Sequence, residues 1–152
     1  MKKITLFAVA CAVAVPLLAS SAYAQFAKPE AAINYRQSAM TLMASHFGRM
    51  QPVFKGQAPY DAAAIKANVA VLQTIAALPW AAFGTGTQKD SNAKPDVWTD
   101  AAGFKAAQDK FSTAMTQLVA AAEAGDLDKL RAASGDVGSA CKGCHDKFQV
   151  KK

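Results

Sequence analysis

Two cysteines and a histidine stand close together near the C-terminal end of the sequence, in the pattern Cys141-x-x-Cys144-His145. In an exported protein this pattern is typical of the covalent attachment of a c-type haem. Residues three apart share a face of a helix, so both thiols can add across haem vinyl groups as thioethers. His145 then stands where a ring nitrogen can bind the iron as the proximal ligand. The pattern therefore predicts haem c, attached through Cys141 and Cys144, with His145 as the metal ligand.

Two other chemistries also use closely spaced cysteines. A redox dithiol of the thioredoxin kind requires a βαβ setting, and nothing in this sequence has the pattern of a strand. A zinc site needs four ligands, and the expected mature chain offers no second C-x-x-C and no histidine pair. A helical binding protein without haem would leave both thiols without a role. Haem attachment is the interpretation that accounts for all three residues.

The N-terminal residues have the composition of an export signal. Two lysines precede an apolar run over residues 4–18, and Ala22-Tyr23-Ala24 follows. We expect a secretory signal peptide over residues 1–24, cut before Gln25, and a mature protein in a bacterial periplasm. The apolar run is too short to span a bilayer comfortably, and we expect no membrane insertion. Cys11 leaves with the signal, so no disulfide is expected.

The expected mature chain, residues 25–152, has the length of one domain. The whole sequence holds 17 basic and 11 acidic residues, and the loss of two lysines with the signal leaves 15 against 11, a net charge of +4. Two haem propionates would lower this toward +2. The sequence has no basic stripe with interleaved aromatic residues, so nucleic acid is not an expected partner.

Apolar residues recur at helical spacings in four stretches, and none has the period of a strand. The expected helices run from about Pro29 to Phe54, from an N-cap at Asp61 to before Pro79, from an N-cap at Thr99 or Asp100 to Gly125, and from an N-cap at Asp126 to the C-terminal end. Their apolar stripes predict one buried face on each helix. The pattern predicts an all-α protein, an antiparallel up-down-up-down four-helix bundle with covalent haem c. Cys141 and Cys144 fall in register with the fourth stripe, which puts the haem inside the bundle.

Two features of this scheme need a reason. The connection over residues 81–99 is long, and loops of that length are usually functional or mobile; here it could cover one edge of the cofactor. Gly135, Gly138 and Gly143 lie in the fourth helix although glycine is a poor helix former. Close approach of a flat ring or of a neighbouring helix is a physical reason to tolerate them.

The sixth ligand of the iron decides the function. Met40, on the inner stripe of the first helix, is the main candidate, although methionine at helical spacing is usually core filler. His46 stands beside the stripe, where it is either a second histidine ligand or a partly exposed residue near the surface. Arg36 interrupts the apolar stripe, and a lone buried guanidinium costs several kcal/mol unless it is paired. Haem propionates are its expected partners; the alternative is a packed stem with the charged head in water.

The stretches YRQSAMTLMASHF (35–47) and LPWAAFG (78–84), together with the C-x-x-C-H near the end of a four-helix bundle, resemble cytochrome c′ of denitrifying β-proteobacteria, a class II c-type cytochrome. The likeness covers essentially the whole mature chain. It implies a homodimer with one five-coordinate, high-spin haem per subunit and a closed apolar distal pocket that binds NO and CO. Matched residue by residue, it implies a distal side of Met40, Met43, Ala44, Trp80 and Phe83, with Arg36 and Gln37 near the propionates.

Two positions depart from the family pattern. The relatives carry leucine where this chain has Met40, and a low-spin branch of the same class uses a methionine of the first helix as sixth ligand. They commonly carry arginine or lysine four residues after the proximal histidine, where this chain has Gln149, so gas chemistry on the proximal face is expected to differ. The leading hypothesis is a non-enzymatic protein that binds, buffers or detoxifies NO. The alternative is a low-spin His145/Met40 cytochrome that carries single electrons between unknown periplasmic redox partners.

Overall fold

The computed structural model describes residues 25–151, and the expected signal peptide lies outside this range. Four long helices make up most of it: α1 (Pro29–Phe54), α2 (Ala62–Ala76), α4 (Ala101–Ala124) and α5 (Leu127–Phe148). Between α2 and α4 lie a 3-10 turn, η2 (Trp80–Ala82), and the short helix α3 (Asp96–Thr99). Residues 25–151 contain no strand beyond an isolated antiparallel bridge between Ala93 and Gln149. The predicted all-α class is confirmed.

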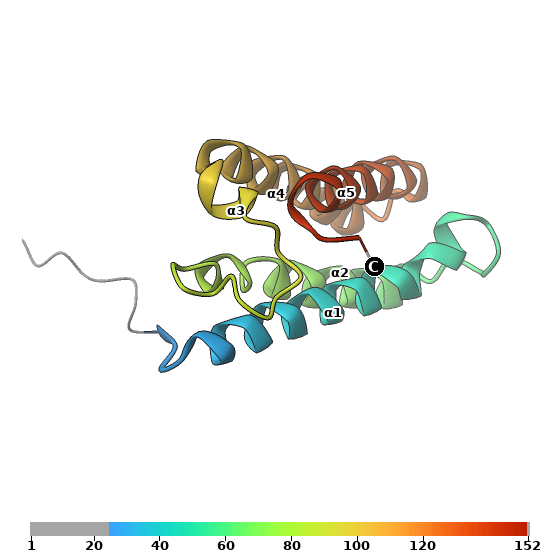
Figure 1. The fold of residues 1–152 in the computed structure, drawn as a ribbon. Helices are drawn as coiled ribbons and strands as arrows, with labels where there is room; N and C mark the ends of the chain where they lie inside the picture. Colours follow the sequence, from blue (N-terminus) through green and yellow to red (C-terminus); the bar gives the residue numbers. More distant parts are fainter. Residues whose placement is uncertain (1–24, 152) are drawn as a thin grey trace, which may run out of the picture.

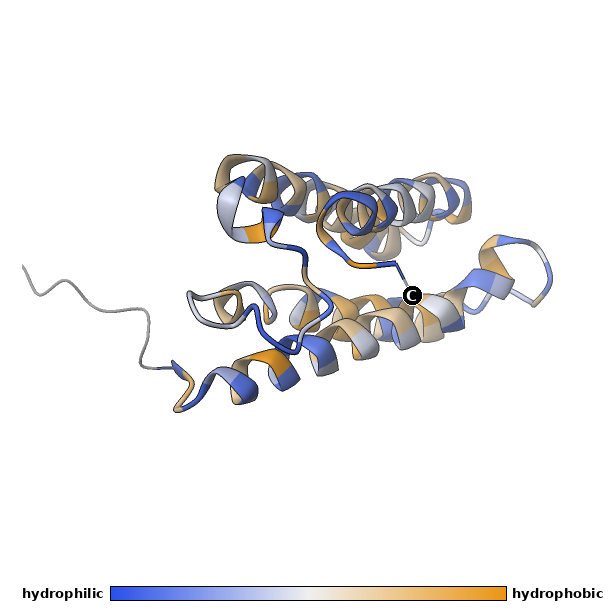
Figure 2. Ribbon diagram, in the orientation of Figure 1, coloured by the Kyte–Doolittle hydropathy of each residue, from blue (hydrophilic) through white to orange (hydrophobic). Residues whose placement is uncertain are grey.

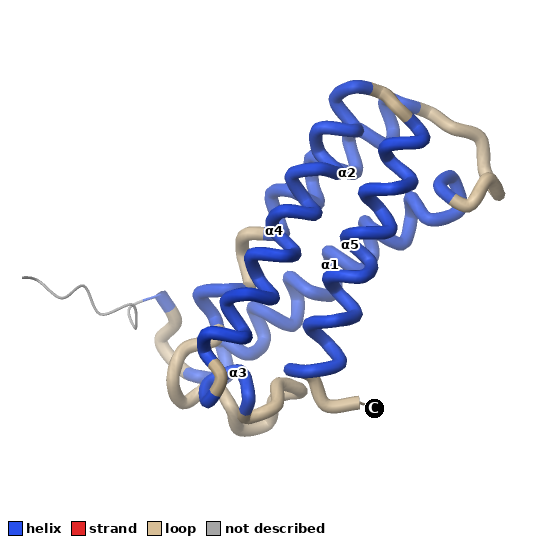
Figure 3. The backbone as a smooth tube through the Cα atoms, turned by 90° about the horizontal axis from the view of Figure 1, so that it is seen from above, coloured by secondary structure: helices blue, strands red, loops and turns tan. Residues whose placement is uncertain are grey.

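The long helices pack in two pairs. Helix α1 packs along α2 and α4 along α5, while α2 also packs on α4. Figure 1 shows the α1–α2 pair on one side of the molecule and the α4–α5 pair on the other, and Figure 3 shows all four helices in one elongated bundle. The contact between α1 and α5 is less extensive than these. The predicted four-helix bundle is therefore confirmed. Of its neighbouring long helices, the first and the last pack together less extensively than the others.

Local residues set the helix ends as the sequence predicts. Asp61, Asp100 and Asp126 each precede a helix, and each side chain accepts hydrogen bonds from backbone N–H groups of the first turn, the usual role of an N-cap aspartate. Of the two candidates at the start of α4, Asp100 rather than Thr99 is therefore the cap. Gly125 ends α4 with a φ of 66°, a left-handed conformation that glycine adopts without a Cβ clash.

The predicted apolar stripes form the core, and Figure 2 shows hydrophobic residues recurring along each long helix. The largest side chains that are fully buried come from all four long helices and from the turn after α2: Met50, Val69, Leu72, Pro79, Leu118, Leu130 and Val137. A Cβ atom at Gly135, Gly138 or Gly143 would meet no atom within 4 Å. Close approach of a neighbouring helix was one of the two explanations expected for these glycines, and that explanation is therefore wrong.

The long connection is more ordered than the sequence indicates. We expected one loop over residues 81–99, yet the stretch includes part of η2 and the whole of α3. A four-residue helix leaves no periodic signal because it spans barely one turn. The connection also pairs with the end of the chain, since the bridge from Ala93 reaches Gln149, just beyond α5.

Helix α2 has a high hydropathy although much of its surface is exposed. By length and composition alone, the segment Ala62–Ala82, which holds α2, the turn after it and η2, could cross a membrane, with a mean hydropathy of 1.4 in its best window, of which only 28% is buried. Core helices can meet the same criterion, and Ile65, Val69 and Leu72 of α2 are core residues. What remains is an exposed apolar face of α2 that continues into the turn after it: Val71 of α2 is 41% exposed, and Leu78 of the turn is 39% exposed.

Candidate haem site

A cavity of about 450 Å³ opens between α1 and the end of α5, and we call it the α1–α5 cavity. These two helices contact each other less extensively than α1 contacts α2 or α4 contacts α5. Its walls come from α1, from the long connection, from α4 and from the end of α5: Arg36, Gln37, Met40, Thr41, Ala44, Trp80, Phe83, Asn92, Ala93, Val97, Phe104, Cys144, His145, Phe148 and Gln149. Most of the residues named from the sequence as site residues therefore converge on a single cavity.

Two residues of the C-x-x-C-H pattern line this cavity, and the third lies nearby on α5. Cys144 and His145 line it, while Cys141, one turn earlier on α5, is half-buried against the main core. Both thiols are free, and burial raises the pKa of each from its usual value. Cys141 does not line the cavity, and its predicted role in attachment stays a prediction.

Aromatic side chains form the apolar wall. Trp80 stacks on Phe83 with ring centroids 6.4 Å apart, and Phe83 meets Phe104 edge-on at 5.0 Å. Phe104 in turn meets Phe148 of α5 at 5.2 Å. Such offset and edge-on pairs are the favoured aromatic geometries. The connection, α4 and α5 therefore share one continuous aromatic wall.

Met40, on α1, is partly buried and lines the same cavity as His145. Met43 is buried in the main core and is not among the cavity-lining residues, so its expected distal role stays a prediction. His46 also lies outside the lining, and its Nδ1 atom is 3.1 Å from Oδ1 of Asn68 on α2. This placement favours the interpretation of His46 as a partly buried residue between helices over that of an iron ligand.

Arg36 is almost entirely buried, with 3% of its surface exposed. Its Nη1 donates to the carbonyl oxygen of Ala82 and to Oγ1 of Thr87, both at 2.7 Å, and its Nη2 donates to the Thr87 carbonyl at 2.6 Å. The guanidinium also lies 4.6 Å from the centre of the Phe83 ring, and burial lowers its pKa. The alternative of a charged head in water is therefore wrong, while pairing with propionates stays a prediction.

Several lining residues were not expected at the site. Phe104 and Phe148 were not named as site residues, although Phe148 follows Cys144 by one helical turn and that spacing places it beside the cysteine. Asn92 and Ala93 belong to the long connection, which was expected to cover a cofactor edge without any residue being named. Thr87, which does not line the cavity but pairs with Arg36, had no sequence signal either, because no periodic pattern runs through the connection.

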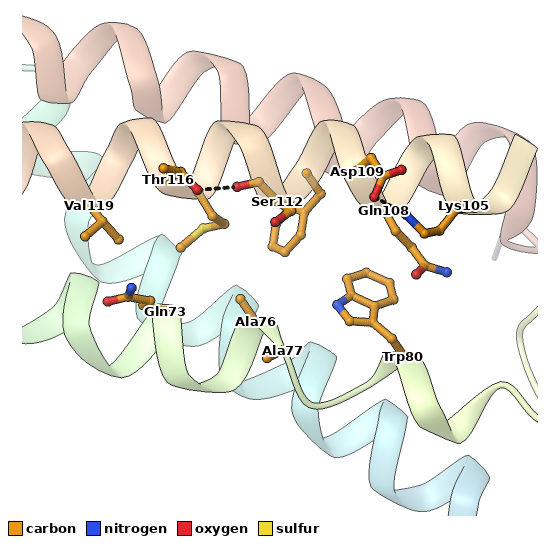
Figure 4. A pocket seen from close by; sticks show the side chains of 12 residues that line it. Gln73, Ala76, Ala77, Trp80, Lys105, Gln108, Asp109, Ser112, Thr116 and Val119 are labelled. Atoms are coloured by element: carbon orange, nitrogen blue, oxygen red, sulfur yellow. Dashed lines mark hydrogen bonds and ion pairs between the residues drawn. The ribbon is translucent and has the colours of Figure 1, made fainter. Parts of the chain in front are cut away.

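A second hollow lies on the outer side of Trp80. This groove of about 380 Å³ runs between α2 and α4, and Figure 4 shows Trp80 at one end of it, opposite Gln108 of α4 and beyond Ala77, the residue that follows α2. Trp80 lines both the groove and the α1–α5 cavity, so its indole ring stands between the two spaces.

The residues of the α1–α5 cavity fit a covalent haem. The volume lies in the range of cofactor sites, which are mostly apolar with a few polar groups. A flat apolar ring suits the aromatic wall, and the edge of the cavity carries a thiol and an imidazole from one helical turn. Together with Cys141, which lies one turn earlier on α5 outside the lining, the donor set is that of a c-type haem, two thiols and a histidine.

Comparison with known proteins decides the family. The family model for cytochrome c′ matches residues 31–149. The chain belongs to the cytochrome c′ family. It is 67% identical to the cytochrome c′ of Alcaligenes xylosoxydans over 128 residues, which cover 84% of this chain and all of the relative.

Solved structures of cytochrome c′ agree with this assignment. A nitric oxide complex of a variant from Alcaligenes xylosoxidans superimposes with a TM-score of 0.82 at 66% identity. A carbon monoxide-bound variant from the same organism superimposes with a TM-score of 0.81 at 66% identity. In both cases the match covers 84% of this chain and all of the other. Cytochrome c′ proteins are four-helix bundles that carry covalently bound haem c, and these neighbours bind NO and CO.

Proposed function

We propose that this protein is an exported cytochrome c′ whose five-coordinate haem iron binds NO and CO, with a role in binding or detoxifying NO in the periplasm. The single observation that carries the proposal is the composition of the α1–α5 cavity. On it converge the predicted iron ligand His145 and an apolar group made of Met40, Trp80, Phe83 and Phe104. When bound, the haem supplies an iron that can take a diatomic gas.

The electrostatics of the cavity support binding of CO and NO rather than of O₂. Bound O₂ is strongly polarised and is stabilised by a nearby hydrogen-bond donor, which the distal pocket provides or withholds. Arg36 is the buried cation in this wall, and its guanidinium already donates to Ala82 and Thr87. The wall therefore offers apolar contact, which suits NO and CO because they depend less on such a donor.

The residues of the chain have separate roles in this proposal. Cys141 and Cys144 hold the haem covalently, and His145 orients it by binding the iron from the proximal side. Met40, Met43, Ala44, Trp80 and Phe83 keep water from the distal face, and Arg36 and Gln37 lie near the propionates. Dedicated turnover of a substrate is not part of the proposal, because binding and release of a gas need only an open coordination position.

Two features of the environment complete the proposal. The basic and apolar start of the sequence supports export, and an unknown periplasmic redox partner would keep the iron reduced. The resemblance to the family supports a homodimer, and the exposed apolar face of α2 is a suitable surface for it, since contiguous exposed apolar patches commonly mark interaction sites.

The experiment that tests the function is the visible absorption and EPR spectrum of the purified holoprotein, ferric and ferrous, with and without CO. We expect a high-spin spectrum that changes when CO is added. A low-spin spectrum with a methionine-to-iron charge-transfer band and no response to CO would overturn the proposal. That outcome would favour the electron carrier with His145 and Met40 as axial ligands, since a thioether ligand raises the potential and closes the gas site.

A further inference from the structure

The first part of the connection, residues 83–94, is fastened to both sides of the α1–α5 cavity, and we call it the strap. At its start it is tied to α1 by Arg36, whose guanidinium donates to Oγ1 and to the carbonyl oxygen of Thr87. Thr87 is 5% exposed, and its hydroxyl in turn donates to the Gly84 carbonyl at 2.8 Å. One threonine therefore joins a buried cation of α1 to a tight turn of the strap.

The far end of the strap is tied to the residues that follow His145. The backbone N–H of Lys94 donates to the Phe148 carbonyl, and that of Val150 donates to the Asn92 carbonyl, both at 2.9 Å. The Lys94 ammonium also donates to the Asp146 carbonyl at 3.0 Å. Backbone pairing of this kind fixes the strap against the end of α5, the helix that carries the whole C-x-x-C-H pattern.

We infer that Thr87 is a positioning residue for gas binding: with Arg36 it anchors the strap, and the strap in turn fixes the aromatic wall of the cavity. This inference rests on the proposed function, since the gas site itself is part of that proposal. Few contacts separate Thr87 from the cavity. Phe83 begins the strap, lines the cavity and lies under the guanidinium of Arg36, which Thr87 binds. Thr87 does not line the cavity and acts only through these neighbours.

The anchor depends on the hydroxyl of Thr87 more than on its bulk. That oxygen accepts a charge-assisted hydrogen bond from Arg36 and donates to Gly84. Hydrogen bonds with a charged partner are about twice as strong as neutral ones. Replacement by valine would keep the shape but leave a buried guanidinium N–H of Arg36 without this acceptor, and unmade buried hydrogen bonds are the costly ones. The Gly84 carbonyl would lose the hydroxyl but keep its hydrogen bonds from the Thr87 backbone N–H and from Nε1 of Trp98. The strap should then open more often while the bundle stays folded.

The test compares three variants of the holoprotein: Thr87→Val, Thr87→Ser and the control Thr113→Val. Thr113 is exposed on α4, and its hydroxyl bonds only the Asp109 carbonyl of its own helix. Two readouts are measured in each: hydrogen exchange of the backbone amides of residues 83–94, and the association rate of CO with the ferrous protein. The first reports the strap directly and does not require gas binding.

For Thr87→Val we expect exchange in the strap to rise about tenfold, with CO association faster by at least about threefold because the wall is looser. Thr87→Ser keeps the hydroxyl and should stay near the wild type in both readouts, as should Thr113→Val. A lower unfolding temperature for Thr87→Val with unchanged strap exchange and CO rate would overturn the inference, because Thr87 would then be merely structural.

The two proposals can fail separately in this experiment. If the wild-type protein does not bind CO, the proposed function is wrong, and strap exchange together with the reduction potential of the haem still tests the anchor. If the wild type binds CO but Thr87→Val and Thr87→Ser match it in every readout, the proposed function stands and the positioning role is overturned.

Discussion

Met40 is the side chain on which the function of this protein turns. It lies on α1, is partly buried and lines the cavity that also receives His145. A thioether in that place either packs beside a gas site or occupies it. The aromatic wall of Trp80, Phe83 and Phe104 gives Met40 apolar neighbours, which suits packing.

Replacing Met40 by alanine should enlarge the gas site. We expect Met40→Ala to stay high-spin and to bind CO severalfold faster. Its free energy of unfolding should fall by about 1–2 kcal/mol, less than the roughly 2–5 kcal/mol of a fully buried methionine. Stopped-flow mixing with CO and thermal unfolding measure these effects.

Met50 supplies the matched control for this variant. It is 1% exposed in the main core and does not line the α1–α5 cavity, so Met50→Ala should lose more stability without changing the CO rate. A change of Met40→Ala from low-spin to high-spin would show instead that the thioether binds the iron in the wild type.

Arg36 illustrates what a sequence reveals and what it leaves open at the scale of one residue. Its place in an apolar stripe predicted a buried, paired guanidinium, and the burial is confirmed. The identity of the partners could not be predicted, because Ala82 and Thr87 lie in the connection, about 50 residues further along the chain. The Cys141-x-x-Cys144-His145 pattern was easier to interpret, since all of its residues lie within two helical turns.

The helices, in contrast, could be predicted almost to the residue. The predicted bounds of the first helix, Pro29 and Phe54, are those of α1, and the predicted aspartate caps are present because capping is a local interaction of three or four residues. The stretch over residues 81–99 could not be resolved in this way. Its order comes from long-range contacts, such as the pairing of Ala93 with Gln149.

Two glycines of neighbouring elements should respond to alanine with opposite signs. Gly125 has a φ of 66°, so Gly125→Ala should lower the free energy of unfolding by about 1–2 kcal/mol. Gly135 lies inside α5 with nothing within 4 Å of an added Cβ, so Gly135→Ala should raise it by about 0.5–1 kcal/mol. Denaturant unfolding of the holoprotein measures both. A stabilising Gly125→Ala would contradict the left-handed cap.

The cap of α5 should make stability depend on pH in acid. Backbone and side-chain hydrogen bonds from Lys129, with its charge, lower the pKa of Asp126. A carboxyl whose pKa is lower in the folded state stabilises the protein fully above its unfolded pKa of about 3.9, and this stabilisation is lost as the pH falls through the folded pKa. Asn is an equally good cap but does not titrate.

Asp126→Asn should therefore resemble the wild type at pH 7 and lose less stability between about pH 4 and pH 2. Thermal unfolding across this range, with both proteins in the same haem state, makes the comparison. Since every other acid-sensitive group is shared, parallel curves for the two proteins would mean that the cap contributes nothing to acid unfolding.

For the whole molecule, the haem should be part of the core rather than an addition to it. The α1–α5 cavity of about 450 Å³ lies between two long helices whose mutual contact is less extensive than those of α1 with α2, α2 with α4 and α4 with α5. A covalently attached haem stays on the chain when the protein unfolds, but its apolar surface is removed from water only in the native state, and that burial stabilises the native state. The double variant Cys141→Ser/Cys144→Ser, which has no attached haem to bury, should therefore be less stable than the holoprotein by at least about 3 kcal/mol. Near-ultraviolet circular dichroism and thermal unfolding measure this, and an unfolding temperature equal to that of the holoprotein would refute it.

The exposed apolar face of α2 leads to the last prediction, which concerns assembly. Val71 lies on α2 and Leu78 in the turn that follows the helix, and both are more than a third exposed. If this face joins two copies of the chain, a charge at its centre must be desolvated on association and should prevent it. Val71→Glu should then elute as a monomer in gel filtration with light scattering, where the wild type has twice that mass. Ala120→Glu adds the same charge to an exposed position of α4 and should leave the dimer intact. A monomeric wild type would refute the dimer. A Val71→Glu variant that remains dimeric would show that the interface lies on another face.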